Sequence, residues 1–344
     1  MNERAETLQR WVARQHDLPL GDCRLEQVAG DASFRHYYRL HLPDGTPRVL
    51  MDAPPERENS RAFVDIARDW RAVALPVPAL HAVDLAAGFV ELEDLGDDVM
   101  HQHLTTEAAA DTWFMRALDL LEHVQRQAPS AALPAYDRDL LGRELDLFHD
   151  WCLSRLLEIP APPEWPALRE ALIDSALAQP RVAVHRDFDA MNLMVRDDTL
   201  WLIDFQDAVR GPLSYDLVSL LRGRYRLWSR ERMDTFIETF HRRAVADGRL
   251  PTDSDIATFT RQVEAMGIQR SLKVLGIFCR LALRDAKPRY LARLPHFLAH
   301  LRHGLEAVPE HAAFLAWVET TLTPALQRAL EHHGIARTRE ENAS

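Results

Sequence analysis

The spacing of apolar residues changes once along this chain, and that change restricts the fold more than any other feature. Before Gly96, apolar residues gather in short β-prone runs. These runs cover residues 25–28, 37–42, 48–51, 80–83 and 89–92. After Gly96, they recur every three or four residues, which is typical of helices. The sequence therefore predicts an α+β fold: a small antiparallel β-rich N-lobe with one helix over 60–73, then a larger, mainly helical C-lobe.

The predicted boundaries follow from the same patterns. We place the N-lobe at 1–95, a hinge at 91–96, the helical C-lobe at 96–336 and a polar tail at 337–344. Asp44-Gly45 is a hairpin signal, and Thr106 is expected to cap the first C-lobe helix. Three short β-prone runs, 182–184, 193–195 and 200–203, interrupt the helical pattern.

Composition excludes several classes of protein. The chain has 344 residues, 47% of them hydrophobic, with 41 Lys and Arg against 52 Asp and Glu, a formal charge of −11. This balance suits a packed core and argues against non-specific nucleic-acid binding. Three distant cysteines without zinc spacing are expected to be reduced core thiols, and no apolar run has membrane-spanning length. We expect a cytoplasmic protein, a monomer, with no nucleic-acid or membrane partner.

The β-prone interruption contains the most informative segment. His185, Arg186, Asp187 and Asn192 match the phosphotransferase catalytic loop H-R-D-x-x-x-x-N at all four fixed positions. A predicted hairpin follows the loop and ends at Asp204. Such enzymes keep a metal-binding Asp at the corresponding place.

These residue types suit phosphoryl transfer from ATP. A carboxylate at Asp187 can orient an acceptor hydroxyl and take its proton. Asn192 and Asp204 offer hard oxygen ligands, which suit Mg²⁺. The motif thus predicts an enzyme with ATP and Mg²⁺ as cofactors, but it does not specify the acceptor.

Neighbouring polar residues have alternative interpretations. We expect His185 to hold the loop by hydrogen bonds and not to exchange protons. Asp189, Gln206 and Asp207 are candidates for substrate contact. Asp207 is equally compatible with a solvated loop charge, and for Asp189 the solvated interpretation is favoured.

The motifs together resemble the aminoglycoside-phosphotransferase and choline-kinase superfamily, which has a protein-kinase-like bilobal fold. Longer stretches resemble the family of bacterial anomeric N-acetylmuramate and N-acetylglucosamine kinases of peptidoglycan recycling. These stretches are 31–35 (DASFR), 51–55 (MDAPP), 92–96 (LEDLG), 203–209 (IDFQDAV), 211–217 (GPLSYDL) and 269–278 (QRSLKVLGIF). The likeness covers nearly the whole chain.

The resemblance implies further roles. A phosphate-covering loop would span 30–35, with Ser33 at its tip, and the backbone of the hinge would meet adenine. Asp216 would brace the catalytic loop. The implied nucleotide-binding residues are Gly30, Ser33, Phe34, Arg35, Met51, Glu91, Leu92, Glu93 and Leu95.

The chain also departs from the protein-kinase pattern. Met51 stands where the third strand would supply a phosphate-binding lysine. Arg35 or Arg48 could replace that lysine, or either could be an ordinary exposed arginine. No A-P-E segment follows Asp204 before Tyr215, so a peptide-recognising activation loop is not expected.

The function favoured by the resemblance is phosphorylation of the anomeric hydroxyl of N-acetylmuramate or N-acetylglucosamine, small amino sugars. The lactyl carboxylate of N-acetylmuramate calls for a cation, and Arg270 and Lys273 could supply it from one helix face. The pair is equally compatible with an ordinary solvated helix face. Two alternatives remain open: an aminoglycoside or other small-molecule hydroxyl kinase, and a nucleotide-binding regulatory pseudokinase.

Overall fold

The computed structural model describes residues 3–28, 34–224 and 226–335. The chain divides into two compact units. Unit 1 comprises Met1–Ala132 with His185–Ala208, and unit 2 comprises Leu133–Val184 with Val209–Ser344. The catalytic-loop segment therefore groups with the N-terminal part of the chain. The lobe boundary near 91–96 stays a prediction, and the tail 337–344 lies outside the described residues.

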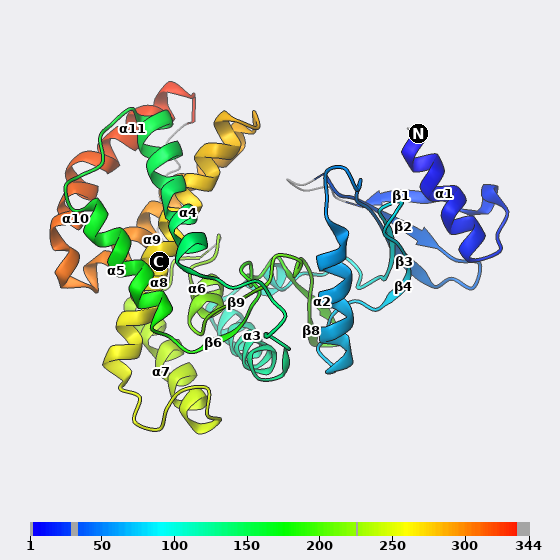
Figure 1. Cartoon of the computed structure of the whole chain (residues 1–344), viewed down its shortest axis with the longest axis horizontal. Helices are drawn as coiled ribbons and strands as arrows, with labels where there is room; N and C mark the ends of the chain where they lie inside the picture. Colours follow the sequence, from blue (N-terminus) through cyan, green and yellow to red (C-terminus); the bar gives the residue numbers. More distant parts are fainter. Residues whose placement is uncertain (1–2, 29–33, 225, 336–344) are drawn as a thin grey trace. The chain divides into compact units, whose positions relative to one another are not determined.

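Unit 1 contains one antiparallel sheet, several helices and a separate hairpin (Figure 1). Its elements are α1 (Glu3–Gln15), η1 (Leu20–Asp22), β1 (Leu25–Val28), β2 (His36–His41), β3 (Pro47–Asp52), α2 (Ser60–Ala72), β4 (Leu80–Asp84), β5 (Phe89–Glu93), η2 (Met100–His103), α3 (Glu107–Gln127), β7 (Leu193–Arg196) and β8 (Thr199–Leu202).

The five-stranded sheet has the order β1-β2-β3-β5-β4, with every neighbouring pair antiparallel. Each strand prediction for the N-lobe is confirmed to within a residue. The predicted turn at Gly45 is present, and Gly88 lies in the turn between β4 and β5. Both have positive φ values, +81° and +75°, which glycine adopts without a Cβ clash.

A helix at the N-terminus is missing from the sequence prediction. The expectation of one N-lobe helix is wrong, because α1 covers one face of the sheet. Leu8, Trp11 and Val12 of α1 pack with Leu40 and Leu50 in one buried apolar cluster. The apolar stripe of α1 is narrow and its sequence is highly charged, so tertiary packing decides this helix.

The second helix, α2, begins where the sequence predicts and is capped by Asn59, whose side chain accepts a hydrogen bond from the Arg61 N–H. Thr106 caps α3 as expected, accepting from Ala109 N–H. The hairpin β7–β8 turns at Asp197 and Asp198, which have φ of +50° and +60°. These values are typical of a two-residue hairpin turn of type I′.

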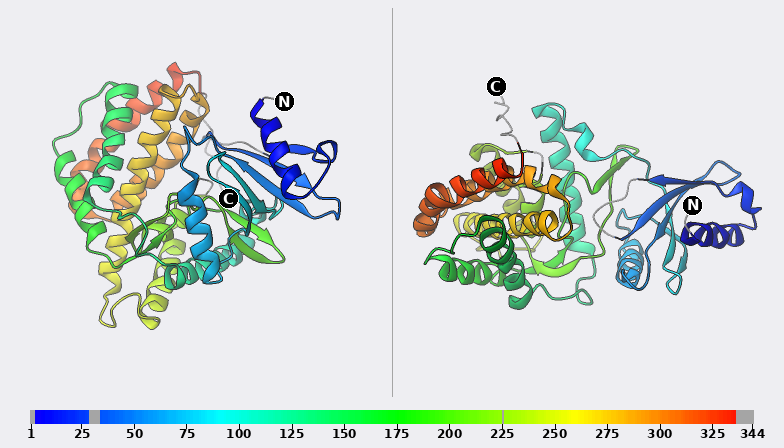
Figure 2. Two further views of the ribbon diagram at one scale, coloured as in Figure 1. Left: turned by 45° about the vertical axis from the view of Figure 1, so that its right-hand side comes forward. Right: turned by 90° about the horizontal axis from the view of Figure 1, so that it is seen from above.

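Unit 2 consists mainly of helices gathered around the long helix α8 (Figures 1 and 2). Its elements are α4 (Arg138–Leu147), η3 (Phe148–Leu157), α5 (Trp165–Leu177), β6 (Arg181–Val184), β9 (Val209–Pro212), α6 (Tyr215–Leu221), α7 (Arg230–Ala246), α8 (Ile256–Leu283), η4 (Pro288–Arg293), α9 (Leu294–Glu306), η5 (Pro309–His311), α10 (Ala312–Trp317), η6 (Val318–Leu322) and α11 (Thr323–His332).

Strand β9 pairs antiparallel with β6 and was absent from the sequence prediction. It contains Gly211 and Pro212, two residues that weaken strand propensity. The prediction of reduced core thiols is confirmed, since Cys23, Cys152 and Cys279 are free and buried.

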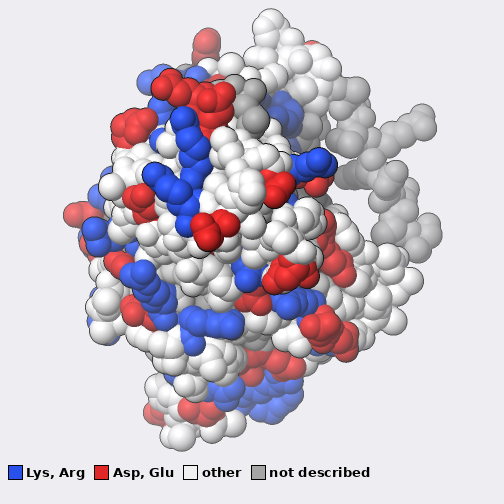
Figure 3. Space-filling view, turned by 90° about the vertical axis from the view of Figure 1, so that its right-hand side faces the viewer, with Lys and Arg blue, Asp and Glu red and all other residues white. Residues whose placement is uncertain are grey.

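Surface features bear on the expected partners. Along the described part of the chain, no helix combines the length and apolar character needed to cross a membrane. On the face drawn in Figure 3, acidic and basic side chains are interspersed among the described residues. The expectations about nucleic acid, localisation and oligomeric state stay predictions.

Two glycines with positive φ provide a matched test of the turn after β4. A Cβ at Gly88 would lie 2.0 Å from the Ala53 carbonyl oxygen, whereas a Cβ at Gly45 would meet nothing within 4 Å. We expect Gly45→Ala to lower the free energy of unfolding by about 1–2 kcal/mol, the cost of left-handed backbone. Gly88→Ala should cost about 1–3 kcal/mol more, because backbone must move. Urea unfolding of both variants checks this, and equal losses would contradict it.

Candidate active site

The catalytic-loop segment is held by hydrogen bonds of its own backbone and side chains. The N–H groups of Asp189 and Asn192 donate to the carbonyl oxygens of Asp187 and Asp189, each at 2.9 Å. The Asn192 side-chain amide donates from Nδ2 to the Asp187 carbonyl oxygen at 2.8 Å. The nitrogen of this amide is therefore engaged within the loop, which leaves Oδ1 as its ligand atom.

His185 joins the loop to the strand that precedes Asp204. The ring is fully buried, its Nε2 lies 2.9 Å from the Ile203 carbonyl oxygen, and Nδ1 accepts a hydrogen bond from the Asp187 N–H at 3.3 Å. A carbonyl only accepts and an N–H only donates, so these partners assign the neutral tautomer with hydrogen on Nε2. The contacts support the bracing role predicted for His185.

Asp204 lies at the end of the β7–β8 hairpin in a left-handed conformation, with φ of +65°. The next residue, Phe205, is fully buried and stacks on Phe63 of α2, with ring centroids 4.9 Å apart. Trp70 of α2 packs on Phe205 at 5.6 Å and on His185 at 6.4 Å. Helix α2 therefore supports both segments that carry the predicted chemistry.

The charge at Asp204 is only partly compensated. Its carboxylate is accessible to solvent, yet surrounding protein raises its pKa, and the nearby negative charge of Asp187 raises it further. Gln206 Nε2 donates a hydrogen bond of 2.7 Å to Asp204 Oδ1, which lowers the pKa. This effect is smaller than that of the surrounding protein and larger than that of the Asp187 charge. The positive charge of Arg35 also lowers the pKa of Asp204. Two neighbouring carboxylates, of which Asp204 has a raised pKa, favour a bound cation.

The residues present supply too few ligands to hold a metal ion by themselves. They fit a metal ion that is also coordinated by phosphate. Within the described residues, no three His, Cys, Asp or Glu side chains are grouped to hold an ion. Asp204 and the oxygen of Asn192 would supply two ligands. Gln206 Oε1 is a further buried oxygen that has no hydrogen-bond partner among the described residues. Mg²⁺ commonly takes one or two carboxylates and completes its shell with water and phosphate.

Two of the candidate substrate residues lie in different environments. Asp189 is buried, with an exposure of 2%, and its Oδ1 accepts the Met191 N–H at 2.8 Å. Its interpretation as a solvated charge is therefore wrong: it shapes the loop. Asp207 is exposed. Whether Asp189, Gln206 or Asp207 contacts substrate stays a prediction.

Arg35 is buried, with an exposure of 7%, and its Nε lies 3.2 Å from Glu58 Oε2. Glu58 also accepts a hydrogen bond from the Phe34 N–H at 3.1 Å, which ties this segment to the start of α2. Phe34 itself is exposed. The interpretation of Arg35 as an exposed arginine is wrong, and Glu58 had no recognisable signal in the sequence.

Arg48 lies on the other face of the sheet from Met51. Side chains alternate along β3, which places Arg48 with Leu50 on the face covered by α1. There Arg48 Nε lies 3.3 Å from Glu91 Oε1, and His16, directly after α1, contacts both carboxylate oxygens of Glu91 at 3.0 Å. Arg48 is thus a partly buried sheet residue and does not share the face of Met51.

The predicted hinge begins inside a strand. Glu91, Leu92 and Glu93 belong to β5, where Glu91 and Leu92 pair with β3 and the Glu93 N–H donates to the Ala79 carbonyl. Leu95 lies beyond the strand and is buried. Of these four predicted adenine contacts, Leu95 is the one whose backbone lies outside the sheet.

An arginine missed by the sequence analysis fixes the segment after β5. Arg39 of β2 donates to both Asp94 and Asp97, with its Nε 2.5 Å from Asp94 Oδ2 and its Nη2 2.9 Å from Asp97 Oδ1. These hydrogen bonds lower the pKa of Asp97. The next residues reach the catalytic hairpin, where the Val195 N–H donates to the Asp98 carbonyl oxygen at 2.8 Å. Such paired charges between strand and loop carry no sequence spacing signal.

The remaining site predictions fall in unit 2 or outside the described residues. Asp216 is fully buried in the first turn of α6. Arg270 and Lys273 are buried in α8, so the interpretation of this pair as a solvated helix face is wrong. Lys273 Nζ lies 3.0 Å from Glu144 Oε1 and donates to the Tyr215 hydroxyl at 2.8 Å. Arg270 donates to the Arg222 carbonyl oxygen at 3.1 Å. Gly30 and Ser33 lie outside the described residues.

Comparison with known proteins identifies the family. A model described as "Phosphotransferase enzyme family" matches residues 24–252, well over half of the chain. The chain belongs to this family.

Individual relatives are more specific. The chain is 39% identical over 300 residues to a Pseudomonas putida protein named N-acetylmuramate/N-acetylglucosamine kinase, covering 86% of this chain and 87% of that one. A Neisseria meningitidis protein of the same name is 38% identical over 321 residues, covering 91% and 95%. The names of both relatives imply ATP as phosphoryl donor.

The fold also matches solved structures. A Plasmodium vivax ethanolamine kinase aligns with a TM-score of 0.63 at 10% identity, covering 84% of this chain and 86% of that chain. The predicted protein-kinase-like α+β fold class is confirmed.

The raised pKa of Asp204 predicts a pH-dependent effect on stability. Above that pKa the folded state bears the cost of the charge, which the unfolded state does not. We therefore expect Asp204→Asn to unfold at higher urea than the wild type at pH 7.5 without ligands. Below the ordinary Asp value, about 3.9, the residue is neutral in both states, so the gain should shrink as pH falls towards 4.

The matched control is Asp197→Asn in the same hairpin, because this side chain is 94% exposed. It should show no such gain at either pH. The assigned electrostatics would be contradicted if Asp204→Asn were no more stable than the wild type at pH 7.5. They would also be contradicted if its gain in stability were the same at pH 7.5 and near pH 4.

Proposed function

We propose that the protein is an ATP- and Mg²⁺-dependent kinase that phosphorylates the anomeric hydroxyl of N-acetylmuramate or N-acetylglucosamine. The relatives with these names match the chain over most of their length. The observation that carries the chemistry is the His185-braced grouping of Asp187, Asn192 and Asp204 within one unit. A role in peptidoglycan recycling follows from the sugars that those relatives are named for.

In the proposed mechanism, Asp187 orients the acceptor hydroxyl and takes its proton as the bond to phosphorus forms. The backbone of Asp187 is fixed on both sides, by the Nδ1 of His185 and the amide of Asn192. An anomeric hydroxyl is more acidic than other sugar hydroxyls, so one carboxylate is sufficient as base. Mg²⁺, when held by Asn192 and Asp204, would neutralise charge on the phosphates.

We assign Arg35 the electrostatic role that the missing lysine would have. Its guanidinium is buried, it is paired with Glu58, and its positive charge reaches Asp204. Arginine also offers several donors in a plane that matches phosphate oxygens. Arg48 does not suit this role, because it lies with Glu91 under α1.

Two cations of α8 are the candidates for recognition of the lactyl carboxylate. The charged ends of Arg270 and Lys273 are engaged by buried partners in unit 2. Arg270 and Lys273 can therefore contact the sugar only if each shares, or gives up, its present buried partner. Phosphorylation of both sugars needs no such contact, since N-acetylglucosamine has no carboxylate.

An ADP-release assay with Mg²⁺–ATP tests the proposed acceptor. N-acetylmuramate and N-acetylglucosamine should be turned over to acid-labile 1-phosphates, and kanamycin should not. Asp187→Asn should lower kcat by about 10²–10⁴-fold while nucleotide affinity is retained, because the base is lost and the fold is kept.

Asp197→Asn, in the solvent-exposed turn of β7–β8, is the control and should keep the wild-type kcat. Turnover of kanamycin alone would reassign the protein to the aminoglycoside kinases. ATP binding without turnover of any acceptor would favour the pseudokinase alternative. A wild-type kcat in Asp187→Asn would exclude Asp187 as the base.

The role of Arg35 is tested with two substitutions. We expect Arg35→Gln to lower kcat/KM for ATP by about 10²-fold, and Arg35→Lys to recover part of the loss because it keeps the charge. Arg48→Gln should leave the KM for ATP unchanged, since it removes a cation from the opposite face. Equal effects of Arg35→Gln and Arg48→Gln would refute the assignment.

A further inference from the structure

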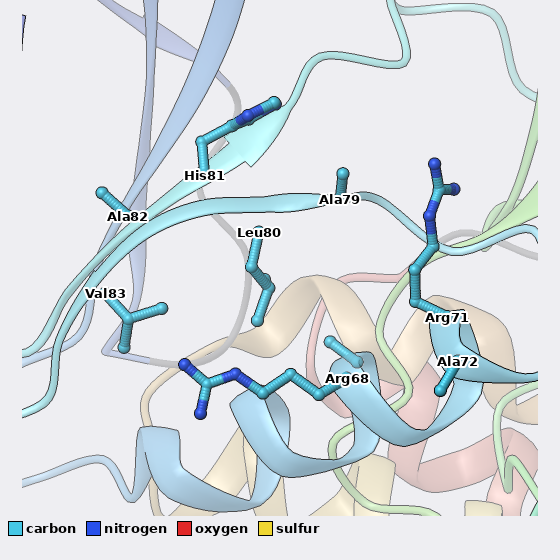
Figure 4. A pocket seen from close by; sticks show the side chains of 9 residues that line it. Arg68, Arg71, Ala72, Ala79, Leu80, His81, Ala82 and Val83 are labelled. Atoms are coloured by element: carbon cyan, nitrogen blue, oxygen red, sulfur yellow. The ribbon is translucent and has the colours of Figure 1, made fainter.

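A cavity of about 440 Å³ lies between α2 and β4, within unit 1 (Figure 4). It is lined by Ala67, Arg68, Arg71, Ala72, Ala79, Leu80, His81, Ala82 and Val83. None of these residues belongs to the predicted nucleotide or catalytic sets. The volume falls within the range of small-molecule sites in proteins.

The cavity exists because small residues face each other where a helix crosses a strand. A helix packed on a sheet normally fills the intervening space with interdigitating side chains. Here Ala67 and Ala72 of α2 face the segment containing Ala79, and the alanines leave the space open. Figure 4 shows Leu80 and Val83 extending towards α2, so the strand side of the cavity is apolar. His81 extends from the opposite side of the strand.

Two arginines on α2 border this apolar space. Arg68 is exposed and forms no hydrogen bond or ion pair with any residue of the described ranges. Arg71 donates to the Val77 carbonyl oxygen at 3.2 Å and lies over the Trp201 ring at 5.7 Å. In Figure 4 the two guanidinium groups lie at different ends of the cavity.

The cavity is locally basic in an acidic chain. Its lining includes no carboxylate, although the chain as a whole has a charge of −11. Asp65 and Asp69 on the same helix are exposed and are not paired with Arg68. Apolar walls with one available guanidinium suit a ligand that has an apolar body and one anionic group.

The neighbouring face of α2 supports the active site, because Ala67 of the cavity lies one helical turn from both Phe63 and Trp70. Phe63 and Trp70, both buried, pack on Phe205, and Trp70 also contacts His185. A ligand that fills the gap between α2 and β4 would therefore act on the helix that positions the residues beside Asp204 and Asp187. Such a ligand changes activity to the extent that it favours one placement of α2.

We propose that the α2–β4 cavity is a regulatory site for a small organic anion, with Arg68 as its anchor. The ligand would be a carboxylate, sulfonate or phosphate ester on a compact apolar body. The binding part is independent of the proposed function, whereas the regulatory part rests on it.

The probe for the binding test is 8-anilinonaphthalene-1-sulfonate, which combines an apolar body with one sulfonate. Saturating ADP occupies the nucleotide site, so that the probe cannot bind there. We expect one site by calorimetry. Arg68→Gln should weaken it about tenfold, since a charge-assisted contact is lost. Ala72→Leu, which fills the cavity from an exposed helix position, should weaken it at least as much.

Arg61→Gln is the matched control, because Arg61 is exposed on the same helix and does not line the cavity. It should bind the probe as the wild type does. Thermal unfolding of each variant checks that the fold is intact. Equal affinity in all variants would overturn the site, and displacement of the probe by millimolar inorganic phosphate would overturn the requirement for an apolar body.

The regulatory part is measured as kcat with saturating probe. We expect kcat to change at least twofold in the wild type and not in Arg68→Gln. An unchanged wild-type kcat would overturn regulation while leaving the binding site in place. Absence of kinase turnover in all conditions would instead count against the proposed function, and the calorimetric result would stand.

Discussion

The neutral ring of His185 is the interaction on which the active-site geometry depends. Its two nitrogens contact the Asp187 N–H and the Ile203 carbonyl, and so fix the catalytic loop against the strand that leads to Asp204. The ring is fully buried beside Trp70 and Phe188. A protonated ring could not accept from Asp187, so the loop geometry requires the uncharged form. This explains why a histidine is useful here without taking part in proton transfer.

Features set by local sequence were predictable, and features set by distant contacts were not. The hairpin at Gly45, the cap at Thr106 and the loop motif 185–192 each depend on a few adjacent residues. Strand β9 forms despite Gly211 and Pro212 because β6 supplies its partner. Helical spacing placed Lys273 on a helix, but it did not show that its ammonium group would form an ion pair with Glu144.

Glu144 and Glu264 explain why the basic sequence of α8 is not a simple cationic surface. Glu144 receives hydrogen bonds from Lys273 and the Tyr136 hydroxyl inside unit 2. Arg222 pairs with Glu264, which also contacts Arg230 at 2.5 Å. Buried charges of this kind are tolerated only when each is compensated. Of the two cations that the sequence suggested for the acceptor, Lys273 is engaged by Glu144 and Arg270 by the Arg222 carbonyl oxygen. Lactyl recognition is therefore restricted to groups that can be shared or to residues elsewhere.

The backbone around the site is strained, and the surrounding aromatic packing holds it. Arg186 and Asp204 have φ of +77° and +65°, a conformation that costs about 1–2 kcal/mol for each residue with a Cβ. Arg186 lies two residues before Phe188, and Asp204 lies directly before Phe205. Both phenylalanines are fully buried, and their packing opposes relaxation of the chain. The site thus combines backbone strain at Asp204 with the nearby carboxylate of Asp187. A bound cation would relieve the charge repulsion but not the backbone strain, so the aromatic contacts of Phe205 must hold Asp204 in place before the ligand arrives.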